Sequence, residues 1–196
     1  MVRDTRLQEF RRILHRYAER SGEEKQTATI VREFLEDCEP DQLITNIGGN
    51  GLAALYQGQT SRPTILIRAD MDALPIPETV DLPHRSQTPE VSHKCGHDGH
   101  TAIVAGLAAR FHEQRPTRGS VVLLFQPAEE TGQGARQVLD DPKFSQFQPD
   151  FVFALHNLPG ALKGQVLLRE GTFASASKGL IIQLKGATSH ASEPEI

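Results

Sequence analysis

The residues best suited to chemistry lie in a histidine-rich run from His93 to Thr101, with the sequence HKCGHDGHT. A single glycine separates Cys95 from His97, and it lets the backbone fold back so that a thiolate and an imidazole can reach one ion. A thiolate ligand must lose its proton, and a divalent cation drives that loss. The alternative is that Cys95 is a small buried residue and that the histidines are polar surface groups.

Two other histidines of this run are weaker ligand candidates. His100 lies one turn into the helix expected after the run, where it can cap or support the loop. His93 precedes the Cys-x-His motif at an unconstrained position. We therefore place neither among the expected metal ligands.

A pair of adjacent carboxylates follows a strongly apolar run. Glu129 and Glu130 stand in QPAEETGQGA, directly after SVVLLF. Neighbouring side chains of an extended segment point to opposite sides, so one carboxylate can bind a metal while the other faces a substrate. Metal-assisted hydrolysis needs this division, because a free carboxylate takes a proton from water and hands it to the leaving nitrogen. The alternative is a solvated acidic turn.

Polar groups also follow two further apolar runs. Asp70 and Asp72, in RADMDALP, share one side of an extended strand end, where carboxylates either orient a ligating histidine or simply terminate the strand. His156 ends the run DFVFALH. A histidine after five buried-type residues is more often part of the core than a ligand, but the neighbouring strand ends strengthen His156 as a ligand candidate.

The spacing of apolar side chains predicts the elements that position these residues. Helical spacing over 5–20 and 24–37 predicts two amphipathic helices. Short β-prone runs around three glycines predict two strands joined by a turn over 41–57. Further helices are expected over 99–113 and 133–140.

Three almost continuous apolar runs, 64–69, 120–125 and 150–156, predict strands covered on both faces. Their alternation with helices favours an α/β fold with a mostly parallel mixed sheet flanked by helices, in which ligands bind beyond the carboxyl ends of strands. The polar clusters stand at three such ends. More strands are expected at 165–170 and 180–186.

Composition disfavours several classes of partner. A formal net charge of -4 and a pI of about 6.1 give no general attraction to phosphate backbones or anionic lipid, so neither nucleic acid nor membrane is expected as the main partner. No secretory signal and no membrane-spanning run are visible. Cys38 and Cys95 lie far apart in the sequence, which makes a disulfide framework unexpected. These features predict a cytoplasmic protein.

Five motifs in order, RADMDALP, CGHDGHT, FQPAEE, LHNLPG and GATSHASEPE, resemble the amidohydrolase branch of the aminoacylase and carboxypeptidase-type dinuclear metallopeptidases. Hippurate hydrolases and plant indole-acetyl-amino-acid hydrolases belong to that branch. The resemblance covers nearly the whole chain, including the opening HRYAERSGEEKQTA. It implies a zinc-exopeptidase-like catalytic domain over 1–176 and the start of a smaller α+β lid and dimerisation domain over 177–196.

The resemblance also implies a role for each matching residue. The implied metal ligands are Cys95, His97, Glu130 and His156. Glu129 matches the general base, and Asp72 matches an aspartate that orients a ligand from behind. His190 resembles a lid histidine that reaches the active site of a partner subunit and helps to hold the substrate carboxylate or the oxyanion. Asp70 and His100 are expected to support the ligands.

Members of that branch hold two divalent ions, so the resemblance implies zinc or manganese, with nickel or cobalt as alternatives. They hydrolyse N-acyl amino acids or small peptides and pair as homodimers when full length. They also continue beyond the point where this chain stops, and a final histidine there completes the dinuclear site. We therefore expect an incomplete second metal site and a fragment that is inactive alone.

Two other functions stay open at this point. The first is a non-catalytic fragment that binds metal or associates with itself, since half a lid leaves an exposed strand edge. The second is nucleophilic chemistry by Cys95 with His97, although the nearby carboxylates suit a metal better than a thiolate. Bound metal without hydrolysis of N-acyl amino acids would favour the first alternative, and loss of activity with a chelator would exclude the second.

Overall fold

The computed structural model describes residues 2–176, 179–186 and 188–192 of the chain. Contacts within the chain divide it into two units, Met1–Leu158 and Pro159–Ile196. Among the described residues, no helix is both long enough and apolar enough to cross a membrane. The domain boundary expected between residues 176 and 177 stays a prediction.

The first unit contains helices and strands close to the predicted positions. In chain order they are α1 (Val2–Arg16), α2 (Lys25–Glu36), β1 (Gln42–Ile47), β2 (Gly51–Gln57), β3 (Thr64–Asp70), α3 (His97–Glu113), β4 (Ser120–Gln126), α4 (Gly134–Asp140) and β5 (Phe151–Ala154). The predicted pair of opening helices, the glycine-turn hairpin and the positions of the three apolar strands are confirmed. The expectation that the third strand is covered on both faces is wrong, because β5 lies at the edge of the sheet and its residues are exposed.

The five strands form one mixed sheet in the order β1-β2-β4-β3-β5. β3 runs parallel to β4 and β5, whereas β2 runs antiparallel to β1 and β4, so two of the four pairings are parallel. The predicted mixed sheet flanked by helices is confirmed. Register aligns Asp70 with Gln126 and Arg68 with Ala154. The carboxyl ends of β3, β4 and β5 therefore meet at one edge of the sheet.

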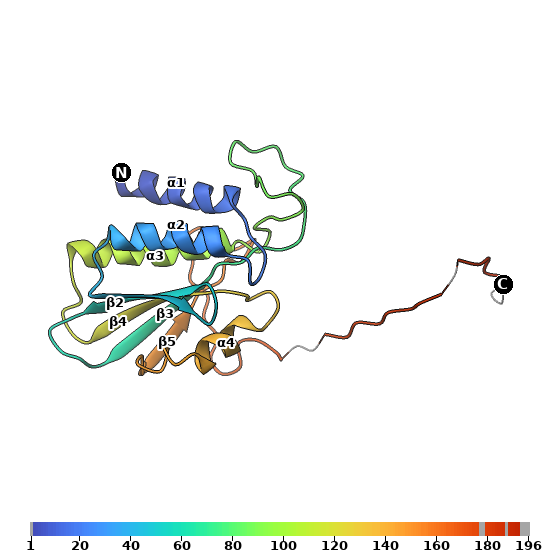
Figure 1. Cartoon of the computed structure of the whole chain (residues 1–196). Helices are drawn as coiled ribbons and strands as arrows, with labels where there is room; N and C mark the ends of the chain where they lie inside the picture. The colour runs from blue at the N-terminus through green and yellow to red at the C-terminus, as the bar shows by residue number, and fades with distance from the viewer. Residues whose placement is uncertain (1, 177–178, 187, 193–196) are drawn as a thin grey trace. The chain divides into compact units, whose positions relative to one another are not determined.

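Helices cover both faces of this sheet. α1, α2 and α3 lie on one face and α4 lies on the other (Figure 1). Because side chains alternate along a strand, β4 contributes to both cores. Leu123 and Phe125 belong to the core beneath α1–α3, whereas Val122 and Leu124 pack with Val138 of α4. All of β4 is buried, which anchors the sheet edge where the polar clusters stand.

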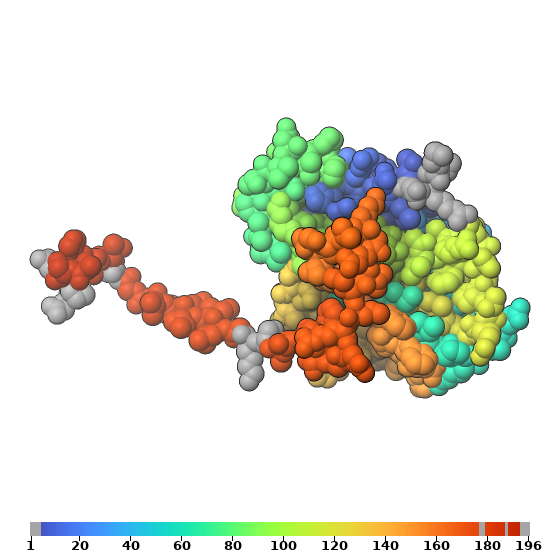
Figure 2. All heavy atoms as spheres, turned by 180° about the vertical axis from the view of Figure 1, so that it is seen from behind, coloured from blue at the N-terminus to red at the C-terminus, as the bar shows by residue number. Residues whose placement is uncertain are grey.

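The long loop between β3 and α3 carries the histidine-rich run. Figure 2 shows it in green beside the blue α1, to which Gln87 binds by donating its main-chain N–H to the oxygen of Arg16 at 2.8 Å. α3 begins at His97, earlier than the predicted start at residue 99. Gly96 precedes it with φ of 92°, in the left-handed region that glycine tolerates. The expected fold-back between Cys95 and His97 is confirmed.

In the second unit, the described residues form turns and irregular chain without a helix or strand element. The strands predicted at 165–170 and 180–186 are therefore wrong for the described residues. An apolar run becomes a strand only where a neighbouring strand pairs with its backbone groups, and apolar spacing alone does not supply that neighbour.

Candidate metal centre

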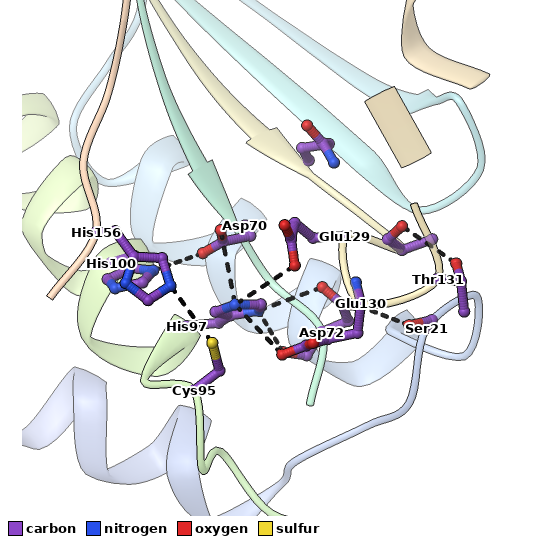
Figure 3. Close-up of polar contacts among 12 residues, drawn as sticks. Ser21, Asp70, Asp72, Cys95, His97, His100, Glu129, Glu130, Thr131 and His156 are labelled. Atoms are coloured by element: carbon purple, nitrogen blue, oxygen red, sulfur yellow. Dashed lines mark hydrogen bonds and ion pairs between the residues drawn. The ribbon is translucent and has the colours of Figure 1, made fainter. Parts of the chain in front are cut away.

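Four segments that are far apart in the sequence meet at the carboxyl edge of the sheet (Figure 3). They are the ends of β3, β4 and β5 and the loop that leads into α3. Three overlapping groups have ligand atoms within 4.8 Å of one another: Cys95–His97–His156, Asp70–His97–His100 and His97–Glu129–Glu130. His97 belongs to all three groups, so it lies at the centre of the cluster.

His97 is fully buried in the first turn of α3. Its Nδ1 donates to the main-chain oxygen of Asp72 at 2.9 Å, which leaves Nε2 as the acceptor of the ring. Within the described part of the chain, this buried Nε2 has no hydrogen-bond partner. It faces other acceptors: Glu130 Oε1 at 3.6 Å, Asp70 Oδ2 at 3.7 Å and Glu129 Oε2 at 3.9 Å.

These gaps fit a divalent cation. A lone pair that faces carboxylate oxygens is stabilised when a cation lies between them. Donors about 2.1 Å from a tetrahedral zinc ion are themselves about 3.4 Å apart, close to the observed separations. Glu130 Oε1 is likewise buried without a hydrogen-bond partner among the described residues. The unpaired atoms of His97 and Glu130 therefore point to a metal site.

Cys95 and His156 lie on another side of the same cluster. Cys95 Sγ lies 3.4 Å from His156 Nε2, and His156 Nδ1 donates to the main-chain oxygen of Asn157 at 2.8 Å. Nε2 of His156 is thus also an acceptor. Burial, followed by the charge of Glu130, raises the pKa of Cys95 to about 12. Without a cation the thiol keeps its proton, which disfavours the alternative of Cys95 as a nucleophile.

The adjacent carboxylates are arranged differently from the expectation. Glu129 and Glu130 lie in a turn instead of an extended segment, because Ala128 before them is left-handed, with φ of 50°. Both carboxylates consequently approach His97 and do not point to opposite sides. The Glu129 side chain is 41% exposed and that of Glu130 only 19%. Glu130 therefore has the surroundings of a ligand, while Glu129 is open to solvent.

Asp72 lies behind the cluster and contacts two of the expected ligands. Its Oδ2 accepts from Ser21 Oγ at 2.6 Å and from the main-chain N–H of Glu130 at 3.0 Å, and its Oδ1 lies 3.4 Å from His97 Nδ1. Burial favours the neutral acid, but the contacts with His97, Ser21 and Glu130 outweigh it and lower the pKa of Asp72 to about 2. Asp72 therefore stays ionised, as an orienting carboxylate must.

Asp70 and His100 connect the ends of β3 and β5. His100 Nδ1 lies 2.7 Å from Asp70 Oδ1, and His100 Nε2 lies 2.5 Å from Oδ1 and 3.0 Å from the main-chain nitrogen of Asn157. Asp70 Oδ2 accepts from Arg68 at 2.8 Å. Since both ring nitrogens of His100 are engaged, its geometry is that of a supporting residue. Asn157 was not predicted, although it directly follows the candidate ligand His156.

A second histidine–carboxylate cluster, which the sequence analysis did not predict, joins α1 to the loop before α3. His15 of α1 contacts Asp98 through Nδ1 and Glu78 through Nε2, both at 3.0 Å. Arg11 lies 3.0 Å from Asp98, and Lys94 lies 3.1 Å from Glu78. This group, which we name the His15 cluster, ties α1 to the loop and to the first turn of α3.

His93 and His190 are the two remaining histidines for which the sequence predicts a position or a role. His93 was expected at an unconstrained position, and that is wrong: it is only 6% exposed, packs beside His15, and has its pKa lowered by burial to about 4. The burial of His93 could not be predicted, because a histidine within a polar loop has no sequence pattern that indicates burial. His190 belongs to the second unit, where Ser192 Oγ lies 2.7 Å from its Nδ1. Its substrate-binding role stays a prediction.

Several known proteins are similar to this chain in sequence and fold. The model of "Peptidase family M20/M25/M40" matches residues 66–191. The chain is 37% identical over 190 residues to an N-acetyl-L-cysteine deacetylase of Bacillus subtilis, covering 94% of this chain and 44% of that protein. It is 35% identical over 189 residues to a hippurate hydrolase of Campylobacter jejuni, covering 96% of this chain and 49% of that protein.

A solved structure has a similar fold. A dinuclear metal binding peptidase of Bacillus subtilis superposes with a TM-score of 0.75 at 37% identity, covering 81% of this chain and 44% of that chain. The chain spans about half the length of the curated relatives it matches.

Proposed function

Because this chain belongs to peptidase family M20/M25/M40, we propose that it supplies the metal-binding part of a hydrolase that cleaves the amide bond of N-acyl amino acids. The observation that carries the proposal is the buried Nε2 of His97, which lacks a hydrogen-bond partner among the described residues and faces three carboxylates. The names of similar proteins, a deacetylase of N-acetyl-L-cysteine and a hippurate hydrolase, support an amide substrate.

The proposed metal ligands are four side chains from three segments: Cys95, His97, Glu130 and His156. A set of thiolate, imidazole and carboxylate donors suits zinc, and manganese, nickel and cobalt are alternatives. A pair of ions is supported by the similar structure described as dinuclear. The chemistry that such ions supply when bound is Lewis acidity toward water and the amide carbonyl.

Glu129 is the proposed base and proton carrier. Its carboxylate is the more exposed of the adjacent pair, and its Oε2 lies 3.9 Å from His97 Nε2, within reach of the centre of the cluster. It takes a proton from the attacking water and delivers it to the leaving nitrogen. Asp72 holds the ring of His97 and the main chain of Glu130 in place during this transfer. These roles match those implied by the sequence motifs.

Further proposals concern the assembled protein. We propose a homodimer in which His190 binds the substrate in the partner's site, with 1–176 as the catalytic segment and 177–196 as the start of a lid domain. A cytoplasmic location is supported by the two free cysteines, Cys38 and Cys95.

A metal titration tests the proposal. The chain is freed of metal with a chelator and titrated with Zn²⁺ or Co²⁺, and the full-length protein is assayed for release of the amino acid from hippurate and N-acetylcysteine. We expect tight metal binding by the chain that His97→Ala abolishes, and hydrolysis by the full-length protein that depends on added metal. Failure of the wild-type chain to bind either ion would reject the metal site.

A non-catalytic metal-binding protein that associates with itself is the second candidate. β5 is an edge strand, and Phe151, Val152 and Phe153 are 56%, 63% and 55% exposed. An open apolar edge favours pairing with another chain. Metal binding without hydrolysis, together with dimers in sedimentation velocity, would favour this candidate over the hydrolase.

A further inference from the structure

A carboxylate that the proposed reaction does not use is buried beneath the site. Glu24, the residue directly before α2, is 0% exposed. Burial of a carboxylate is costly unless hydrogen bonds replace the lost water. Its side chain makes no capping bond to α2. The start of the helix therefore does not explain why a carboxylate is needed at this position.

Three neutral N–H groups bind this carboxylate. Glu24 Oε1 accepts from the main-chain N–H groups of Gly22 and Ala128, both at 2.8 Å. Glu24 Oε2 accepts from Asn50 Nδ2 at 3.0 Å. Ala128 is 104 residues away in the sequence and lies just beyond β4. Glu24 therefore links the loop between α1 and α2 to the strand end that carries the candidate base.

Ala128 turns the chain from β4 toward Glu129 and Glu130. Its φ of 50° lies in the left-handed region, which alanine adopts only where surrounding contacts hold it. Its oxygen accepts from the N–H of Gly134 at 2.9 Å, while its own N–H donates to Glu24. The N–H of Glu130 donates to Asp72 at 3.0 Å. Two buried carboxylates thus hold the main chain of this turn.

We propose that Glu24 is a positioning residue: by binding the N–H of Ala128, it fixes the turn that directs Glu129 and Glu130 toward His97. Glu24 itself touches neither the ligand atoms nor the reacting atoms. The consequence for metal and turnover rests on the proposed function, whereas the bond to Ala128 stands without it.

Glu19 offers a matched control on the same loop. Its carboxylate also accepts three hydrogen bonds, from the N–H of Gln26 at 3.1 Å, the N–H of Thr27 at 2.7 Å and Thr27 Oγ1 at 2.8 Å. These bonds close the start of α2 and do not reach the turn after β4. Substitution of Glu19 therefore removes a comparable number of carboxylate bonds without loosening the site.

The test compares Glu24→Gln and Glu24→Ala with Glu19→Gln and Glu19→Ala. The readouts are the amide hydrogen exchange of Ala128 by NMR, the affinity for Co²⁺, and kcat and KM. Because a carboxylate can accept at both oxygens whereas an amide can accept at only one, Glu24→Gln should speed exchange at Ala128 roughly tenfold. In the full-length protein, Glu24→Ala should lower kcat about a hundredfold with little change in KM, as a misplaced catalytic group does.

Glu24→Ala should also weaken Co²⁺ binding, since Glu130 shares the turn. The Glu19 variants should lower the thermal midpoint yet keep wild-type exchange at Ala128 and wild-type Co²⁺ affinity. Unchanged exchange at Ala128 in Glu24→Gln would overturn the proposal, as would a parallel loss of Co²⁺ affinity in both series.

The glutamine pair keeps the test decisive if Glu24→Ala does not fold, because both side chains retain their size. The outcome is also separable from that of the proposed function. A wild-type chain that binds no Co²⁺ rejects the metal site, whereas the exchange rate of Ala128 still reports whether Glu24 holds the turn.

Discussion

Two histidine–carboxylate clusters flank the first turn of α3, and they differ in whether both ring nitrogens of the central histidine are paired. In the His15 cluster both ring nitrogens lie 3.0 Å from a carboxylate. In the cluster around His97, Nδ1 is bonded but Nε2 has no hydrogen-bond partner in the described ranges, and it faces carboxylate oxygens instead. Asp98 Oδ1 is also buried without a hydrogen-bond partner among the described residues, so the contrast concerns the ring nitrogens. Both nitrogens of His15 contact carboxylates, whereas His97 keeps one buried nitrogen without a hydrogen bond.

The two clusters also differ in how their carboxylates are balanced by basic side chains. The carboxylates Asp98 and Glu78 are matched by Arg11 and Lys94 in the His15 cluster. Around His97 four carboxylates converge, namely Asp70, Asp72, Glu129 and Glu130, and Arg68 contacts Asp70. A surplus of buried acceptors is stable only with a bound cation or proton. We infer that the His15 cluster stabilises the fold and that the His97 cluster binds metal.

Substitution of Glu129 should separate turnover from metal binding within the His97 cluster. Glu129→Gln keeps the size of the side chain but removes the base, so kcat of the full-length protein for an N-acyl amino acid should fall about a thousandfold. Affinity for Zn²⁺ should stay near the wild-type value, because Glu130 keeps its carboxylate. Retained turnover, measured alongside a calorimetric metal titration, would contradict the assignment of Glu129 as base.

Metal affinity should distinguish His97 from His15. His97→Ala removes the central donor, and its Zn²⁺ affinity should fall about a hundredfold or more, since loss of even an outer partner of a ligand costs about 10–100-fold. His15→Ala leaves all four proposed ligands in place, so its affinity should remain close to the wild-type value. Equal losses in the two variants, measured by competition with a chromophoric chelator, would remove the distinction between the clusters.

Stability of the metal-free chain should show the opposite pattern. His15→Ala breaks a buried ion pair with Asp98, and the free energy of unfolding should fall by about 3 kcal/mol. His112→Ala is the control. This histidine of α3 also lies near a carboxylate, 3.6 Å from Glu39, but it is exposed, so its loss should lower the free energy of unfolding by less than about 0.5 kcal/mol. Urea unfolding of both variants checks the prediction, and a similar small loss in each would make the His15 cluster incidental.

A smaller effect concerns pH. The hydrogen bond to Asp98 outweighs burial and, with Glu78, raises the pKa of His15 above 6.5. Because the folded-state pKa is the higher one, this stabilisation is fully present below about pH 6.5 and is lost as pH rises through the folded-state pKa. The difference in unfolding free energy between wild type and His15→Ala should therefore shrink from about pH 5.5 to about pH 8.5. A difference that grows over this range would contradict the assignment.

Much of the fold could be predicted from local patterns. The apolar run of β4 predicts a strand buried on both faces, and Gly96 predicts the fold-back between Cys95 and His97. Apolar runs that lack a pairing strand, as at 165–170 and 180–186, mislead the same reasoning. The turn at Ala128 was missed as well, because an alanine carries no signal for the left-handed region.

The site was predicted as a set of residues but not as a network. Residues at strand ends and in one motif, such as Cys95 and His97, indicate metal chemistry by their type and spacing. The partners that hold them come from distant segments: Ser21 reaches Asp72 across 51 residues, and His15 reaches Asp98 across 83. No local pattern encodes such pairs, since tertiary packing alone brings them together.

Cobalt binding would reveal directly whether Cys95 and His97 hold a metal ion. Titration of the metal-free chain with Co²⁺ should produce the intense near-ultraviolet absorption of a thiolate–cobalt bond, and Cys95→Ser should abolish that band while Cys38→Ser keeps it. This result would show that Cys95 gives up its proton to a cation held beside His97. Absence of the band in the wild-type chain, or its survival in Cys95→Ser, would contradict a metal centre at this edge of the sheet.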